Sequence, residues 1–315
     1  MAQGIDEQFV EIVVAGLLGG IEVEDGATSE QLNLLFSLTT NLWGRDDLDL
    51  GQVSPLSPSA LAAKLEGEEG RRRFCELLMV LEMCRHPQSE RQVSRVEEYV
   101  DALDVRGLEV EALRTDLERG ADAASRDLER YYDVILPEIS EISLRDHYLH
   151  LETPDHSLSK RLQDLHNLGE GTLGYEYIEF YRRNNIELPG DDVHVPAHYV
   201  NHDMNHVITG YEPTAPGEIA RSGFLAAANE SQHNWIEFLL TLSIHETGIL
   251  NHGAIRAKVA TLDRSGCADL LAEGFARGAQ CSVDLSQVDH LAIADRDLEE
   301  IRAEFNIVPL TKPMI

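Results

Sequence analysis

The chain has 315 residues, 43% of them hydrophobic, which is enough for a sizeable core and is a length typical of about two domains. Its 56 acidic residues outnumber 26 basic ones, and the resulting net charge of -30 would repel nucleic-acid phosphates and anionic lipid head groups. The composition therefore excludes a nucleic-acid-binding protein. The four cysteines form no CxxC pair and are too sparse for a disulfide framework, so we expect reduced thiols.

The beginning of the chain, "MAQGIDEQFVEIVVAGLLGG", is not typical of a signal peptide. It lacks a basic segment, and Glu11 interrupts its apolar run. No stretch of the sequence reaches the roughly 20 apolar residues that span a bilayer. We therefore expect a cytoplasmic protein, which could still associate peripherally with the inner face of a membrane.

The first hundred residues have the pattern of amphipathic helices. In "RRRFCELLMVLEMCRHP", apolar residues recur at spacings of three and four, which places them on one helix face. Helix starts are predicted at Thr28, Ser57 and Ser89, the first and last of which have the glutamine of a capping box three residues later. We predict that residues 1–104 form a bundle of about five helices within an all-α protein.

One segment of this bundle, "AGLLGGIEVEDGATSEQLNLL", has a helix, an acidic turn and a second helix. This arrangement is similar to that of a TerB-like (tellurite-resistance) domain. The resemblance implies a helical N-terminal domain. The acidic residues of the turn, Glu22, Glu24 and Asp25, could bind a cation or simply form a solvated loop.

The remaining chain is predicted to be helical as well. Residues 105–139 are rich in charge and carry a stripe of leucines, which favours a connecting helical segment that ends at Pro137. Residues 140–315 are predicted to form a second helical domain. The architecture expected from sequence is therefore two helical domains joined by a helical connection.

The stretch "HVPAHYVNHDMNHVITG" contains the most informative pattern of the chain. Histidines recur in it at every fourth position, at His194, His198, His202 and His206. Pro196 suits a first helical turn, so we expect a helix from about residue 197 with His194 in the preceding loop. His202 and His206, one turn apart, then share a face, and Asp203 lies on its flank.

A loop and a second helix follow. Gly210 and two prolines predict the loop, and Glu218 falls in the first turn of the next helix, which would fold back and bring Glu218 near His202 and His206. Two imidazoles and two carboxylates suit zinc or ferrous iron. Spacing alone leaves open a metal site, a solvated polar face and a buried hydrogen-bonded histidine cluster. His198 could serve there as an acid or base.

The spacing His202-Asp203-x-x-His206, then eleven residues and Glu218, resembles the HDxxH-x11-E signature of the coenzyme Q (ubiquinone) biosynthesis protein 4 family. The flanking segments "HVITGY" and "GEIA" agree with that family. So do the more distant segments "GTLGYEYIEFYRRNNI", "EGFARGAQ" and "DRDLEEIRAEFNI". The resemblance covers roughly residues 145–310.

This resemblance implies an all-helical fold in which His202, Asp203, His206 and Glu218 bind a divalent metal, zinc or iron. It also implies peripheral membrane association, a homodimer, a prenylated quinone precursor or other isoprenoid lipid bound between helices, and a place in a quinone-biosynthesis complex. The family activity, oxidative decarboxylation of a polyprenyl-hydroxybenzoate intermediate, would make the chain an enzyme. The N-terminal domain and the acidic surface depart from the family, which leaves room for another quinone or lipid.

Two other classes of protein use similar residues. The first is a non-catalytic lipid-binding or assembly scaffold, whose metal only ties two helices together. The second is an HD-type phosphohydrolase, which would add His166 and Asp263 to the histidine-aspartate pair, although the spacing to the glutamate argues against it. On a later helix, His233 and Glu237 could orient the ligands from outside or form ordinary polar pairs.

Overall fold

The computed structural model describes residues 4–106, 130, 133–145, 154–191, 198–229, 231–251 and 255–311. Over these ranges the protein is all-α, which confirms the predicted fold class, and its β-structure is limited to two isolated bridges. No helix in the described ranges is both long and apolar enough to cross a membrane. All four cysteines are free and buried.

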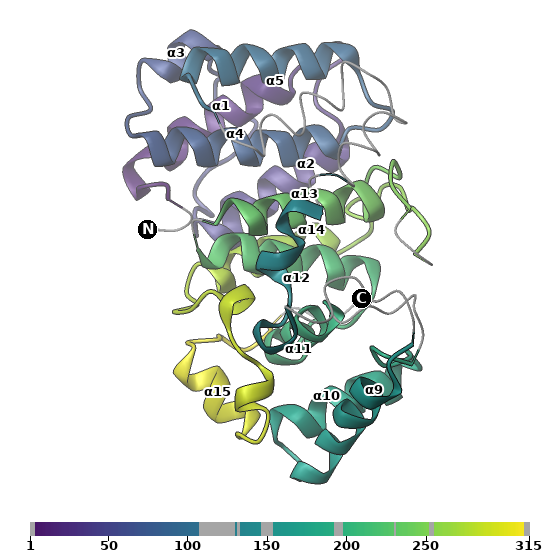
Figure 1. Ribbon diagram of the computed structural model, residues 1–315. Coiled ribbons are helices and arrows are strands. Elements are labelled where there is room, and N and C mark those ends of the chain that lie inside the picture. The colour runs from purple at the N-terminus through teal and green to yellow at the C-terminus, as the bar shows by residue number, and fades with distance from the viewer. Residues whose placement is uncertain are drawn as a thin grey trace.

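The helices of the N-terminal part are α1 (Val10–Ile21), α2 (Ser29–Ser37), α3 (Pro58–Ala62), α4 (Glu68–Met83) and α5 (Glu90–Leu103). A π-helical turn, η2 (Leu38–Leu42), extends α2. The α-helices of the C-terminal part are α9 (His156–Gln163), α10 (Leu173–Asn184), α11 (Tyr199–Thr209), α12 (Ala215–Ala228), α13 (Gln232–His245), α14 (Cys267–Gly278) and α15 (Leu298–Glu304). Helices α1, α3, α4 and α5 lie at one end of the molecule, α12 to α14 in the middle, and α9, α10 and α15 at the other end (Figure 1).

Three helix starts follow local sequence chemistry as predicted. Thr28 forms a complete capping box with Gln31, and the Ser57 hydroxyl caps α3 at its N-terminus. The Ser89 hydroxyl accepts a hydrogen bond from the Gln92 amide at 3.2 Å. The Gln92 side chain does not return to this cap, because it donates instead to a carbonyl of α1 at 2.8 Å.

The predicted end of the connecting helix at Pro137 is wrong. Residues 133–139 are helical and include Pro137. A proline removes one backbone hydrogen bond, but the residues after it can keep helical geometry. Here Ile135 and Ile139 are buried in a small apolar cluster with residues of α13, and this packing holds the segment in place. Most of the predicted segment 105–139 lies outside the described residues.

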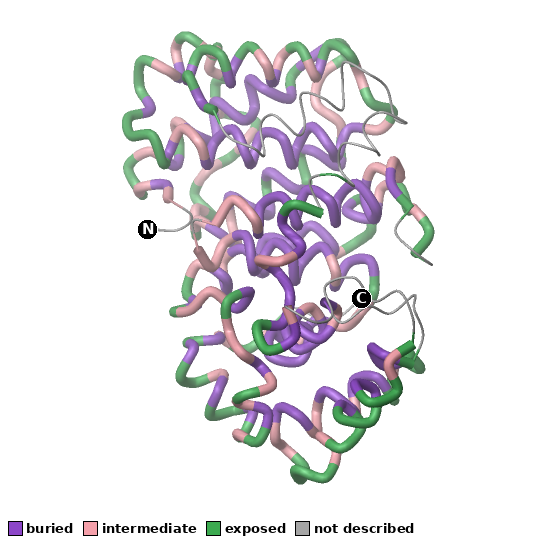
Figure 2. Tube along the Cα trace, viewed as in Figure 1, coloured by how far each residue is buried: buried purple, intermediate pink, exposed green. Residues whose placement is uncertain are grey.

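The main hydrophobic core contains residues from both the N-terminal and the C-terminal parts of the chain. One cluster contains Phe74 of α4, Trp235 and Phe238 of α13, and Phe275 of α14. The guanidinium of Arg73 lies 4.7 Å from the centre of the Trp235 ring. Most residues of the central helices α12 to α14 are buried (Figure 2). The predicted boundary between domains near residues 104–140 stays a prediction, because this core spans both parts. The aromatic residues of α13 serve as ordinary core packing.

Helices α12 and α14 approach closely through glycines. A Cβ added to Gly278 would lie 2.1 Å from the Phe224 carbonyl oxygen, and one added to Gly274 would lie 2.6 Å from the Ala220 carbonyl oxygen. Both obstacles are backbone atoms, which cannot rotate away. The contact therefore requires glycine at these two positions of α14.

We expect Gly278→Ala to lower the free energy of unfolding by about 1–3 kcal/mol, since the added methyl group must push α12 and α14 apart. Urea denaturation of the purified variant measures this loss. Gly70→Ala in α4 is the matched control, because its nearest neighbour would be 3.8 Å away. That variant should be neutral or slightly stabilising. Equal behaviour of the two variants would contradict the close contact.

Candidate metal centre

The local sequence places α11 and α12 side by side across a short turn. Helix α11 ends at Gly210, whose φ of 84° closes the helix in a conformation that glycine adopts without strain. The Thr214 hydroxyl then caps α12 by accepting a hydrogen bond from the Gly217 amide at 3.2 Å, and Pro216 occupies the first turn. Glu218 therefore lies in the first turn of α12, close to the end of α11, as predicted. Residues 192–197, which include His194, lie outside the described residues.

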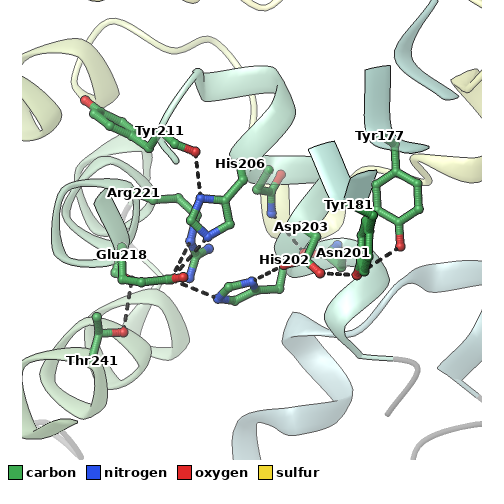
Figure 3. A network of polar contacts seen from close by, with 12 residues as sticks. Tyr177, Tyr181, Asn201, His202, Asp203, His206, Tyr211, Glu218, Arg221 and Thr241 are labelled. Atoms are coloured by element: carbon green, nitrogen blue, oxygen red, sulfur yellow. Dashed lines mark hydrogen bonds and ion pairs between the residues drawn. The ribbon is translucent and has the colours of Figure 1, made fainter. Parts of the chain in front are cut away.

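Two imidazoles converge on one carboxylate oxygen. The Nε2 atom of His206 lies 3.1 Å from Oε2 of Glu218, and the Nε2 atom of His202 lies 3.4 Å from the same oxygen (Figure 3). The His206 side chain has no exposed surface, whereas 22% of the His202 side chain remains exposed. His202, His206 and Glu218 therefore lie together as predicted. Of the two histidines, His202 is the one that solvent can reach.

The other nitrogen of each ring has its own partner. His206 Nδ1 lies 2.9 Å from the backbone carbonyl of Tyr211, to which it can only donate. His202 Nδ1 lies 2.8 Å from Oδ1 of Asp203. A proton on each Nδ1 leaves the Nε2 lone pair directed at the shared position near Glu218. This is how metal-binding histidines are usually oriented from outside.

Asp203 is held on its other side by a tyrosine. The hydroxyl of Tyr181 on α10 donates to Oδ2 of Asp203, and the Tyr177 hydroxyl lies 3.4 Å from that of Tyr181. Burial, together with the Asp203 charge, raises the pKa of Tyr181 well above its usual range, so the phenol keeps the proton that it donates.

The cluster offers two overlapping sets of metal ligands. Donor atoms of His202, Asp203 and His206 all lie within 4.8 Å of one another. Glu218 faces the same two imidazoles on their Nε2 side. Asp203 can therefore ligate directly, as the family resemblance implies, or act by orienting His202. His202 and His206 belong to both sets.

The charges of the cluster favour the binding of a cation. Burial raises the pKa of Glu218, but the neighbouring His206 and His202 outweigh burial and hold this pKa well below its usual range. Burial and Arg221 lower the pKa of His202, but Glu218 and Asp203 outweigh them and raise it to about 9. The ionised Glu218 therefore draws positive charge to this point, as a proton on His202 or as a metal ion.

Arg221 brings a permanent positive charge to the same place. Its Nε atom lies 3.9 Å from Oε2 of Glu218, and its Nη2 atom donates to Glu237 of α13 at 2.7 Å. Only 1% of its side chain is exposed, and Nε and Nη1 have no hydrogen-bond partner within the described ranges. Glu237, which could orient the ligands from outside or form an ordinary polar pair, thus pairs with Arg221. The sequence could have indicated a role for Arg221, because this residue lies one helical turn after Glu218.

A second buried network fixes α11 from a neighbouring face. His290 lies with Nδ1 3.0 Å from Oε2 of Glu141 and with Nε2 3.0 Å from the side-chain oxygen of Asn205 on α11. All three side chains are buried. This network leaves α11 little freedom to rotate, so the positions of His202 and His206 are set before any ligand arrives.

The other predicted residues are not among the donor atoms that group around His202 and His206 in the described part of the chain. His198 is the N-cap of α11, buried, with its ring 4.4 Å from that of Tyr199. His166, in the 3-10 segment before α10, pairs with Glu179 of α10 at 2.8 Å. Asp263 acts electrostatically on Glu30, far from this cluster in the sequence. Neither His166 nor Asp263 is among the described residues whose donor atoms group with His202 and Asp203, so the structure adds no support for the ligand set of an HD-type phosphohydrolase.

One histidine near the centre was missed from sequence. His245, at the end of α13, is buried, and the charges of Glu218 and His202 both act on it. Burial is the largest influence and lowers the pKa of His245, so its ring stays neutral near neutral pH. No spacing relates His245 to the motif, since packing of α13 against α12 brings it there.

Comparison with known proteins adds no relative. No protein-family model matches the chain, and no curated protein matches it. We therefore infer the function from the motif spacing, the donor geometry and the charges around them.

Proposed function

We propose that this protein is a metal-dependent enzyme of quinone biosynthesis that acts on a prenylated hydroxybenzoate by oxidative decarboxylation. The observation that carries the proposal is the convergence of His202 and His206 on Glu218, in residues that match the HDxxH-x11-E signature. The residues fit a divalent metal, because their nitrogen and oxygen donors suit zinc or iron. When bound, zinc would supply Lewis-acid chemistry and iron would add electron transfer.

The proposed reaction exchanges the ring carboxyl group for a hydroxyl group. The bond between the ring carbon and the carboxyl carbon breaks, carbon dioxide leaves, and a new carbon–oxygen bond forms. One oxygen atom of dioxygen enters the ring, and a two-electron donor from outside the chain reduces the other to water.

Arg221 supports an anionic substrate. Two of its nitrogens lack hydrogen-bond partners among the described residues, although the side chain is buried. Buried donors without partners are costly, and a substrate carboxylate would satisfy them. Glu237 fixes the guanidinium through Nη2, which leaves Nε and Nη1 for such a ligand. Asp203, held by Tyr181, keeps His202 oriented throughout.

A non-catalytic scaffold is the second candidate. The cluster ties α11 to α12 and His206 is fully buried, as in a structural metal site. In this alternative, the protein would bind a prenylated lipid or quinone-biosynthesis partners, with a metal that fills its coordination sphere from protein ligands. The partial exposure of His202 favours the enzyme, because a substrate needs an accessible side.

The test compares anaerobically purified wild type with His202→Ala/His206→Ala. Metal analysis should show that the variant loses the zinc or iron of this centre. Incubation with a prenylated hydroxybenzoate, dioxygen and a reductant, followed by mass spectrometry, should show hydroxylated product falling at least about 100-fold. His166→Ala, a surface histidine, is the control and should retain both metal and activity.

Unchanged metal content in the double variant would refute the ligand assignment. A wild type that binds metal, converts no substrate and unfolds without the metal would favour the scaffold.

A further inference from the structure

A second set of metal-ligating side chains lies between the N-terminal and C-terminal parts of the chain. It comprises Glu30 on α2, His86 after α4, and Glu246 directly after α13. Their donor atoms all lie within 4.8 Å of one another. His86 Nε2 is 2.7 Å from Oε1 of Glu246 and 3.9 Å from Oε2 of Glu30. This set shares no residue with the first cluster.

The two carboxylates of this set are buried, and within the described residues their ion-pair partner is His86 alone. The Glu246 side chain has no exposed surface and that of Glu30 has 6%. Glu30 Oε1 has no hydrogen-bond partner within the described part of the chain, and the charged groups that act on Glu30 are the carboxylates Glu246 and Asp263. Two buried carboxylates in contact require a shared proton or a cation.

The protonation of Glu30 agrees with this geometry. Burial and the neighbouring Glu246 raise the pKa of Glu30 to about 9. Glu246 is positioned independently, because its Oε2 atom accepts a hydrogen bond from the Leu262 amide at 2.8 Å. Its other oxygen faces His86, whose side chain is 20% exposed and opens the set to solvent.

We propose that Glu30, His86 and Glu246 bind a divalent metal ion that links α2 and the segment after α4 to the end of α13. Two carboxylates and one imidazole are ligands for Mn²⁺, Fe²⁺ or Zn²⁺. Three protein ligands leave room for water from the exposed side of His86. Entry of the ion displaces the proton held by Glu30. The site joins the two halves of the molecule and does not depend on the proposed enzymatic function.

The experiment isolates this site in full-length protein. In the His202→Ala/His206→Ala background, equilibrium dialysis against Mn²⁺, counted by electron paramagnetic resonance, should show one bound ion per chain. Addition of Glu30→Gln or His86→Ala should abolish this binding. Saturating Mn²⁺ should also raise the thermal midpoint by roughly 5 °C, and the added substitutions should remove this rise. Zn²⁺ serves as a second probe.

The controls separate binding at this site from nonspecific binding and from misfolding. His166→Ala/Glu179→Gln removes a half-buried histidine–glutamate pair with a 2.8 Å contact and should leave Mn²⁺ binding unchanged. Glu30→Gln should fold normally, because glutamine resembles a protonated glutamate. If the background variant does not fold, Glu30→Gln in the wild type should lose one bound ion per chain. Mn²⁺ binding that survives both Glu30→Gln and His86→Ala would overturn the proposal, whatever the outcome for the first centre.

Discussion

Replacing Arg221 by methionine should lower the free energy of unfolding by about 3–5 kcal/mol. The substitution leaves the Glu237 carboxylate buried without the guanidinium that now lies 2.7 Å away. It also removes the positive charge 3.9 Å from Glu218. Urea denaturation with a chelator present measures this loss without a contribution from bound metal. We expect it to be among the largest effects of any single substitution near the centre.

A double variant separates the cost of the unpaired charge from the loss of packing. Arg221→Met/Glu237→Gln removes both charges, so most of the lost stability should return. Binding of an aromatic carboxylate should still be weakened in the double variant, because the unpartnered guanidinium donors are gone. If the double variant is as unstable as Arg221→Met, then the pair is not what stabilises this region.

The metal-free protein should lose stability as the pH rises from about 6.5 to 9. The folded-state pKa of His202 is about 9, above its usual value of 6.5, because Glu218 and Asp203 outweigh burial and Arg221. A raised pKa contributes stability that is fully present below pH 6.5 and is lost as the pH passes the folded value. The shift corresponds to at most about 3 kcal/mol, which chemical denaturation at a series of pH values in chelator can detect.

The same pH range contains a second titrating group. The pKa of Glu30 is raised from 4.5 to about 9, so its contribution is also present at low pH and lost on the same rise. The measurement therefore belongs in a Glu30→Gln background, with Glu30→Gln/His202→Gln as the matched control that should show a flatter curve. A flat curve in Glu30→Gln itself would refute the raised pKa of His202. Saturating zinc should reverse the trend, because protons compete with the metal.

Local chemistry explains the parts of the fold that sequence predicts well. The hydroxyls of Thr28, Ser57 and Ser89 satisfy amides one turn ahead, so a few neighbouring residues specify each helix start. Gly210 and the prolines likewise fix the turn that brings Glu218 to the histidines. The centre is predictable because its ligands lie within one helix–turn–helix unit.

Contacts between distant segments have no such signal. Glu30, His86 and Glu246 come from three segments separated by dozens to hundreds of residues, and no spacing relates them. Tyr181 reads as one more member of an apolar helix face, although its hydroxyl bonds Asp203. At Pro137 a local signal was present but gave the wrong prediction. Proline disfavours a helix, yet packing of the neighbouring residues keeps the segment helical. These features depend on how distant segments pack together, and neighbouring residues in a single sequence do not reveal that packing.

The glycine contact between α12 and α14 restricts where a lipid tail can lie. A single methyl group on Gly278 would fall 2.1 Å from a backbone oxygen of α12, so this seam has no room for one carbon atom. An isoprenoid chain carries a methyl branch on every five-carbon unit and is far wider than that. If the centre binds a prenylated substrate as proposed, the tail of that substrate must therefore leave by a path other than the seam at Gly274 and Gly278.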